Sequence, residues 1–193
     1  MKVLGVSGSL RKGAHSTQLL ESARRALPAD AELEIYDGLR QLPFYDEDID
    51  TPELAGPAVA ELRREIAEAD ALLIVTPEYN GTIPGGLKNL IDWVSRPADD
   101  PLVKGKPVAV LSSSTGQYGG VWALADAKRS LGIAKARVID SEFAVSRVHK
   151  LIEEHGDALH SDREDELAET LERLVEEARI NRSLAEQRAA AAA

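Results

Sequence analysis

Three short segments of this 193-residue chain gather glycines, hydroxyl groups and cations of the kind that bind phosphorylated ligands. The first, Ser7 to Thr17, contains glycines, serines and the cations Arg11 and Lys12. Glycine lets the backbone approach a ligand closely, and free N–H groups at a helix start favour an anion such as a phosphate monoester. Because the segment matches neither the dinucleotide fingerprint nor the P-loop motif, it favours a mononucleotide. A flexible turn that ends in a helix-capping serine is the alternative.

The second and third segments also combine glycines with polar residues. In Thr76 to Gly86, two prolines flank a tyrosine, so a rigid backbone can aim N–H groups at a planar ring while Tyr79 supplies stacking surface. The alternative is an Asn-Gly turn in which Tyr79 caps the core. Ser112 to Gly120 again joins hydroxyls and glycines, and its backbone could hydrogen-bond to the edge of the same ring.

Each of these segments follows a short apolar run, at residues 3–6, 72–75 and 108–111. The runs are nearly continuous and rich in β-branched residues, which predicts strands buried on both faces. Weaker strands are expected at 33–36 and 137–139, and segments with helical spacing separate all five. This alternation predicts an α/β protein with a parallel sheet between two helical layers. Because loops that follow parallel strands emerge at one edge, the three segments should meet there.

Apolar residues at helical intervals mark the expected helices. The expected buried residues are Leu19, Leu20, Ala23 and Leu27 in the first helix, Val59, Leu62 and Ile66 in the second, Leu87, Leu90, Ile91 and Val94 in the third, and Leu167, Leu171, Leu174, Val175 and Ala178 in the last. The first helix begins near Ser16 and the last near Arg163. A further helix follows Gly119 and Gly120 and is expected to end at Gly132.

We expect one domain over residues 1–178 and a helical extension or frayed tail over 179–193. The formal net charge of −10 argues against nucleic acid and anionic membranes as main partners. The chain has no cysteine, which excludes disulfides, thiolate nucleophiles and zinc–thiolate sites. No metal site is expected. No apolar stretch approaches the length of a membrane span, so we expect a cytoplasmic protein.

Several segments resemble the NAD(P)H-dependent FMN reductase family, a flavodoxin-like group that includes bacterial quinone, chromate and azo-dye reductases. They lie at residues 8–13, 42–48, 77–81, 84–93 and 105–120. The most specific part is PEYNG at 77–81, followed by the LKN and DW elements of 84–93. The resemblance therefore covers the chain from its start to about residue 120.

This resemblance implies a flavodoxin-like three-layer sandwich with a five-stranded parallel sheet of order 2-1-3-4-5. It implies FMN as cofactor and NADPH or NADH as co-substrate. Hydride would pass through flavin N5 to a small-molecule electron acceptor, which could be a flavin, quinone, azo dye or metal oxyanion. Relatives assemble, so a homodimer or homotetramer is expected.

The resemblance also implies the cofactor-binding residues. Ser9, Arg11, Ser16 and Thr17 would hold the FMN phosphate, Pro77, Glu78, Tyr79, Asn80 and Gly81 would surround the isoalloxazine, and Ser113, Thr115 and Gly116 would close its other edge. No catalytic side chain is implied, because flavin N5 carries the chemistry. The chain departs from many relatives in having Ala14 in place of serine and Ser16 in place of asparagine. Trp93 lies on a helix that forms the dimer contact in relatives, although its spacing fits core packing equally.

Other functions were weighed against the residues. A hydrolase would need G-x-S-x-G at a strand-to-helix turn, but residues 5–9 read GVSGS. A calcium loop starting at Asp46 fails because Thr51 and Pro57 stand where glycine and glutamate are needed. A non-enzymatic flavodoxin-type electron carrier stays open as the alternative, since Tyr118 could shield a flavin. The choice between NADPH and NADH also stays open.

Overall fold

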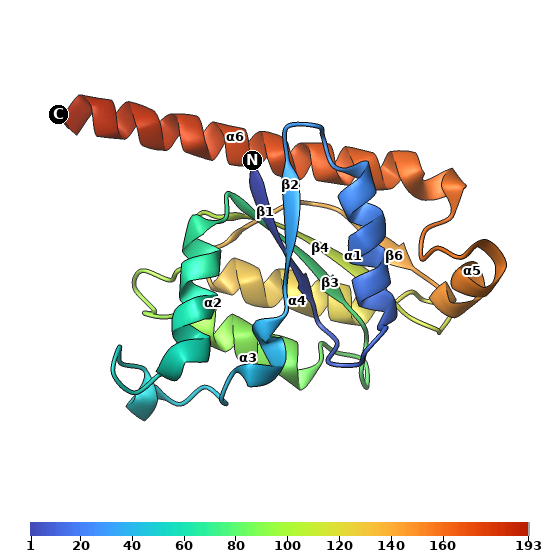
Figure 1. Cartoon of the computed structure of the whole chain (residues 1–193), viewed down its shortest axis with the longest axis horizontal. Helices are drawn as coiled ribbons and strands as arrows, with labels where there is room; N and C mark the ends of the chain where they lie inside the picture. The colour runs from blue at the N-terminus through green and yellow to red at the C-terminus, as the bar shows by residue number, and fades with distance from the viewer. Residues whose placement is uncertain (193) are drawn as a thin grey trace.

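The apolar runs form the strands of one parallel sheet (Figure 1). The structure is a computed structural model, and it describes residues 1–192. The strands are β1 (Lys2–Ser7), β2 (Glu32–Tyr36), β3 (Ala71–Thr76), β4 (Pro107–Ser113), β5 (Arg137–Val138) and β6 (Ala144–Val145). Their order, β2-β1-β3-β4-β5, confirms the predicted flavodoxin-like α/β fold. The short β6 was not predicted, and it pairs with β4 at Ser112 and Ser113.

Helices cover both faces of the sheet. They are α1 (His15–Ala26), α2 (Gly56–Glu68), α3 (Gly85–Val94), α4 (Val121–Ile133), α5 (Val148–His155) and α6 (Glu164–Ala192). Side chains alternate along each strand, so Leu72 and Ile74 of β3 join the core under α2, α3 and α4, whereas Leu73 and Val75 join the core under α1 and α6. This packing confirms the three-layer sandwich. Within residues 1–192, no helix is both long enough and apolar enough to span a membrane.

Two predicted helix ends are wrong. Leu27 follows α1 rather than lying in it and is only partly buried. Helix α4 does not end at Gly132 but continues to Ile133, and Lys135 takes the left-handed conformation with a φ of 65°. The Lys135 carbonyl accepts from the Gly105 N–H at 2.8 Å, and its ammonium donates to the carbonyls of Ala98 and Asp99. Contacts with a distant loop therefore fix this end of α4, which local sequence does not show.

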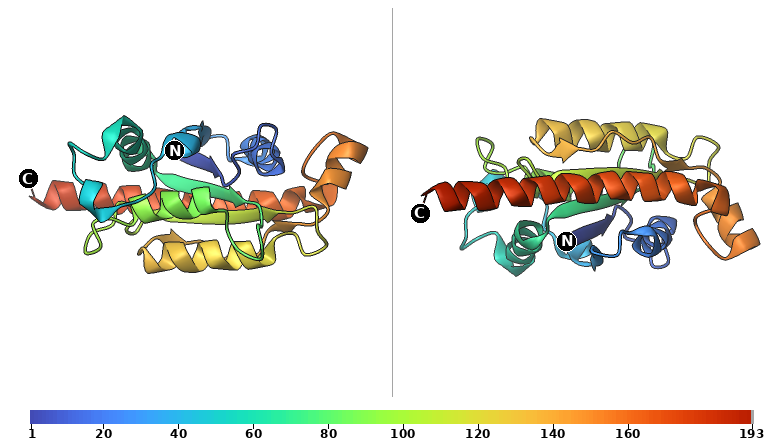
Figure 2. Two further views of the ribbon diagram at one scale, coloured as in Figure 1. Left: turned by 90° about the horizontal axis from the view of Figure 1, so that it is seen from below. Right: turned by 90° about the horizontal axis from the view of Figure 1, so that it is seen from above.

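Helix α6 runs without a break through the expected boundary at residue 178 and reaches Ala192 (Figure 2). Its first half packs on the sheet through residues such as Leu171 and Leu174, which are fully buried. Farther along, Arg179 pairs with Asp30 and Arg182 with Asp70. From residue 183 onward the described side chains are exposed, so the end of α6 projects past the sheet. The division of the chain at 178 stays a prediction.

The segment at 42–48 is fastened to α3 by hydrogen bonds. The Asn89 amide and the Trp93 indole N–H both donate to the Pro43 carbonyl at 2.8 Å. Asn89 also accepts from the Tyr45 N–H at 2.8 Å, and the Trp93 ring, fully buried, meets the Tyr45 ring edge to face. Trp93 is therefore a core residue. These bonds orient α3, which begins directly after the loop that follows β3.

Candidate functional site

The loops that follow β1, β3 and β4 line one cavity of about 330 Å³ at the carboxyl edge of the sheet. Its lining residues are Ser9, Arg11, Ala14, His15, Ser16, Pro77, Glu78, Tyr79, Ser113, Ser114 and Thr115. Strands β2 and β3 lie on opposite sides of β1, so the direction in which strands are added to the sheet reverses beside β1. Parallel sheets bind ligands at such switch points.

The β1–α1 loop presents unpaired N–H groups to this cavity. Helix α1 has Ala14 at its N-cap, and no side chain caps it. Within residues 1–192, the backbone N–H groups of His15, Ser16 and Thr17 have no acceptor. Three such donors at a helix N-terminus are suited to an anion, because the helix dipole adds to the hydrogen bonds.

Hydroxyl groups beneath these donors hold the loop together. The Ser7 and Ser16 hydroxyls lie 2.8 Å apart, and the Thr17 hydroxyl donates to Ser7 at 3.0 Å. Ser16 is 1% exposed, so its hydroxyl is buried beside the free N–H groups. Nearer the opening, Ser9 accepts from the Arg11 N–H at 3.2 Å. The hydroxyl network therefore fixes the start of α1 without using its N–H groups.

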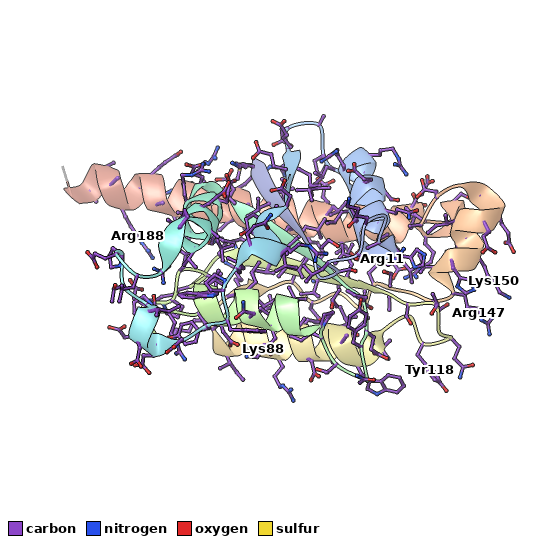
Figure 3. The ribbon with its side chains drawn as sticks, turned by 60° about the horizontal axis from the view of Figure 1, so that its bottom comes forward. Arg11, Lys88, Tyr118, Arg147, Lys150 and Arg188 are labelled. Atoms are coloured by element: carbon purple, nitrogen blue, oxygen red, sulfur yellow. The ribbon has the colours of Figure 1, made fainter. Side chains whose placement is uncertain are left out.

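Two basic side chains, Arg11 and His15, lie at the same end of the cavity. The Arg11 guanidinium has no hydrogen-bond or ion-pair partner within residues 1–192, and it extends from the loop before α1 (Figure 3). Burial, together with the charges of Arg11 and His149, lowers the pKa of His15 below its ordinary value of 6.5. An anion bound here would pair with the Arg11 guanidinium. Its negative charge would also favour the protonated form of the His15 imidazole.

The β3–α3 loop, by contrast, is closed on itself. Tyr79 and Thr82 exchange backbone hydrogen bonds of 3.0 and 3.2 Å across Asn80 (φ 53°) and Gly81 (φ 76°). Two consecutive positive φ angles define a type I′ turn, for which Asn-Gly is the favoured pair. The Asn-Gly alternative is thus correct for the backbone. Tyr79 does not cap the core, because 52% of it is exposed at the cavity.

Glu78 caps helix α4. Its carboxylate accepts from the N–H groups of Trp122 and Ala123 at 3.1 and 3.2 Å, in place of a side chain from the N-cap residue Gly120. The Thr82 hydroxyl adds a second tie by donating to Asp126 of α4 at 2.7 Å. Oε2 of Glu78 accepts both bonds and so holds the β3–α3 loop against α4, and Glu78 also lies on the cavity wall.

The loop after β4 contains a buried hydroxyl without a partner. Ser113 is 2% exposed and lines the cavity, yet no acceptor or donor for its Oγ exists within residues 1–192. Its neighbour Ser112 is satisfied, because its hydroxyl donates to the Gly119 carbonyl at 2.9 Å. The Ser114 hydroxyl accepts from the Gly116 N–H at 3.0 Å. A buried orphan hydroxyl facing a cavity indicates a ligand position.

The structure brings most of the predicted site residues together. On the cavity wall lie Ser9, Arg11, Ser16, Pro77, Glu78, Tyr79, Ser113 and Thr115. The other predicted residues do not line the cavity: Asn80, Gly81 and Gly116 lie in the same loops and Thr17 in the first turn of α1. Sequence reasoning missed Ala14, His15 and Ser114 as lining residues. The place of His15 directly before the expected start of the first helix, inside the segment Ser7 to Thr17, was the signal that could have found it.

Fold and cavity together define a flavodoxin-like α/β protein with a cavity at the sheet switch point that is lined by free helix N–H groups. A model of the NADPH-dependent FMN reductase family matches residues 1–150, and the chain belongs to this family.

Individual relatives agree with this assignment. The chain is 44% identical over 119 residues to an NAD(P)H-dependent FMN reductase of Pseudomonas aeruginosa, and 42% identical over 120 residues to a quinone reductase of Escherichia coli. Each match covers 62% of this chain and 63% of the relative, which is less than two thirds of the relative's length. Among solved structures, a flavoenzyme NAD(P)H:(acceptor) oxidoreductase from Paracoccus denitrificans has a TM-score of 0.79 at 29% identity, with 92% of this chain and 97% of that chain covered.

The residues of the cavity fit the FMN that the family name implies. The unpaired N–H groups of α1 and the Arg11 guanidinium suit its phosphate. The orphan Ser113 hydroxyl lies across the cavity, where a ring with polar edges would complete its hydrogen bonding. A volume of about 330 Å³ falls within the usual size of ligand pockets, about 300–1,000 Å³.

Proposed function

We propose that this protein is an FMN-dependent NAD(P)H oxidoreductase that reduces a small-molecule electron acceptor such as a quinone. The observation that carries the proposal is the cavity itself, with free helix N–H groups and Arg11 at one end and an orphan hydroxyl with an exposed tyrosine at the other. The family match over residues 1–150 and the names of the relatives support the same activity.

Each loop has a distinct task in this proposal. Arg11, Ser9, Ser16 and the N–H groups that open α1 bind the phosphate, while Thr17 holds Ser7 and so keeps the loop in shape. Pro77 and Tyr79 flank the isoalloxazine, and the Asn80–Gly81 turn sets the position of Tyr79. Glu78 caps α4 and in this way holds the β3–α3 loop in position. Ser113, Thr115 and Gly116 lie at the opposite edge, where Ser113 donates a hydrogen bond.

When bound, FMN supplies a ring that takes hydride from a reduced nicotinamide and gives electrons to an acceptor. The protein's part is to bind, orient and leave one side of the cavity open to both substrates. Tyr79, half exposed at this opening, is placed to contact whichever planar substrate enters. No side chain needs to act as a base.

The proposal includes three finer points. NADPH or NADH serves as co-substrate, and the acceptor belongs to the quinone, flavin, azo-dye or metal-oxyanion classes. The protein acts as a homodimer or homotetramer. It works in the cytoplasm, where reduced nicotinamide nucleotides are available.

The absorbance spectrum of the purified protein, before and after anaerobic NADPH, tests cofactor and activity together. We expect flavin bands that bleach rapidly with NADPH or NADH and return when a quinone is added. Flavin bands that persist in both reduced nucleotides would instead identify the electron-carrier alternative. A protein that neither retains nor binds added FMN would overturn the proposal.

A further inference from the structure

A group of unpaired cations distinguishes one end of this acidic molecule. Most Lys and Arg side chains within residues 1–192 donate to a carboxylate, carbonyl or hydroxyl oxygen. The side chains within this range that have no such partner are those of Arg11, Lys12, Arg147, Lys150 and Arg188. Arg188 lies in the projecting end of α6, whereas the others come from the β1–α1 loop and from the start of α5. In a chain with net charge −10, such grouping points to an anionic ligand.

The start of α5 is attached to the cavity wall. The Arg147 N–H donates to the Gly116 carbonyl at 3.0 Å, and the Val148 N–H donates to the Ser114 carbonyl at 3.1 Å. The Lys150 N–H in turn donates to the Arg147 carbonyl at 2.9 Å, which keeps these two residues within one turn. Figure 3 shows Arg147 and Lys150 toward the same end of the molecule as Arg11.

Two further observations connect this turn to the cavity. His149, between the two cations, lies near enough to His15 on the cavity wall to contribute to its lowered pKa, after burial and Arg11. Arg147 has a φ of 48°, a left-handed conformation that glycine adopts more easily than an arginine. A cation is thus held at a position whose backbone favours a different residue.

The FMN phosphate does not require these two cations. The free N–H groups of α1 and Arg11, on the cavity wall itself, already supply donors and positive charge for one phosphate. Arg147 and Lys150 are outside the wall, beyond the loop after β4. They suit a second phosphate that arrives with another ligand.

We propose that Arg147 and Lys150 bind the 2′-phosphate of NADPH and make the protein prefer NADPH to NADH. This inference rests on the proposed function, because it assigns a specificity element to the same site. A phosphate monoester carries up to two negative charges, and an arginine beside a lysine pairs with it through charge-assisted hydrogen bonds. NADH lacks this group and gains nothing from the pair.

The double variant Arg147→Gly with Lys150→Ala tests the assignment. Glycine suits the left-handed φ at residue 147, so the fold is expected to tolerate the change. We expect KM for NADPH to rise about tenfold, as when a charge-assisted contact is lost, with KM for NADH and the bound FMN unchanged. Arg188→Ala, which removes another unpaired cation far from the cavity, is the matched control and should change neither KM.

A binding measurement gives a readout that does not depend on turnover. By calorimetry on the FMN-loaded protein, adenosine 2′,5′-bisphosphate should bind more tightly than adenosine 5′-monophosphate, and the double variant should lose this difference. Equal affinity for the two nucleotides in the wild-type protein would overturn the inference. So would a double variant that loses FMN while its preference for NADPH persists, because the cations would then serve the cofactor phosphate.

The two proposals fail in different ways. If neither reduced nucleotide bleaches the flavin but the bisphosphate still binds through Arg147 and Lys150, the proposed function is wrong and the phosphate site stands. If both nucleotides bleach the flavin and the double variant leaves their KM ratio unchanged, the phosphate site is wrong and the proposed function stands.

Discussion

The β1–α1 and β3–α3 loops lie side by side at one sheet edge but differ in whether their polar groups are hydrogen-bonded within the protein. In the β3–α3 loop, Glu78 is bonded to α4, and Tyr79 and Thr82 are bonded to each other. In the β1–α1 loop, the N–H groups of the first helical turn and the Arg11 guanidinium have no partner within residues 1–192.

This difference separates residues that position a site from residues that bind. A polar group that is satisfied within the protein gains little from a ligand, whereas an unsatisfied one gains a full hydrogen bond. Residue type alone does not make the distinction, because Glu78 and Ser113 were both expected to contact the flavin. In the structure, Oε2 of Glu78 accepts two bonds from α4, whereas the Ser113 hydroxyl has no partner within residues 1–192.

The largest expected effect is that of Arg11→Ala on FMN retention. Hydrogen bonds to charged groups contribute about 1.5–3 kcal/mol, so the Kd for FMN should rise about 10- to 150-fold. Equilibrium dialysis or flavin fluorescence measures this change. Because the Arg11 side chain has no partner within residues 1–192, the urea midpoint of the apoprotein should stay the same. An unchanged flavin content after purification would contradict the phosphate role.

The pattern of apolar runs was sufficient to predict the parallel sheet and the meeting of the three loops, and the family resemblance supplied the order of the strands. Long buried strands such as β3 and β4 are continuous apolar runs, so their signal is strong. β6 has only two residues, so it has no alternation to detect. Helix α5 spans eight residues, and although Val148, Leu151 and Ile152 have helical spacing, only Val148 is fully buried, so its apolar signal is short. The cations proposed to bind NADPH lie in this undetected region.

Contacts between distant residues explain what else the sequence did not reveal. The bond from Trp122 to Glu78 spans 44 positions, and the bond from Trp93 to Pro43 spans 50. The motif residues Glu78 and Trp93 were recognised as a pattern, but their structural roles depend on which element packs against them. Patterns of residue types identify such positions without stating what they contact.

Glu78→Ala tests the positioning half of the comparison. Loss of a helix cap typically costs about 0.5–2 kcal/mol, so the free energy of unfolding from urea titration should fall by about 1 kcal/mol. Glu78→Gln keeps an acceptor and should recover part of the loss. Glu142→Ala, which breaks only a surface pair with Lys128, should cost less than about 1 kcal/mol. If Glu78→Ala weakens FMN binding with stability unchanged, Glu78 is a direct contact rather than a cap.

Ser113→Ala tests whether an unbonded polar group binds the ligand. Its expected effects are smaller, and they differ in sign between protein stability and FMN binding. Removal of a buried hydroxyl that lacks a partner should leave the apoprotein as stable or slightly more stable. FMN binding should weaken about fivefold, the loss of roughly 1 kcal/mol from one neutral hydrogen bond. Ser112→Ala is the matched control, because it breaks a bond to Gly119 and should destabilise the protein. Stability losses of the same size at both serines would show that Ser113 has a partner in the folded chain.

The smallest expected effect is on the pH dependence of stability, through His15 at the start of α1. Burial, Arg11 and His149 lower the pKa of His15, so the folded chain takes up this proton less readily than the unfolded chain. Stability should therefore be unaffected above the ordinary value of 6.5 and decrease as the pH falls below it, and His15→Gln should remove that part of the slope. NMR titration of His15 gives the direct measure.

Both Arg11→Ala and bound FMN should raise the pKa of His15, the first by removing a cation and the second by adding an anion beside the ring. A pKa that responds to neither change would place His15 and Arg11 apart and would leave the phosphate end of the site to the helix N–H groups alone.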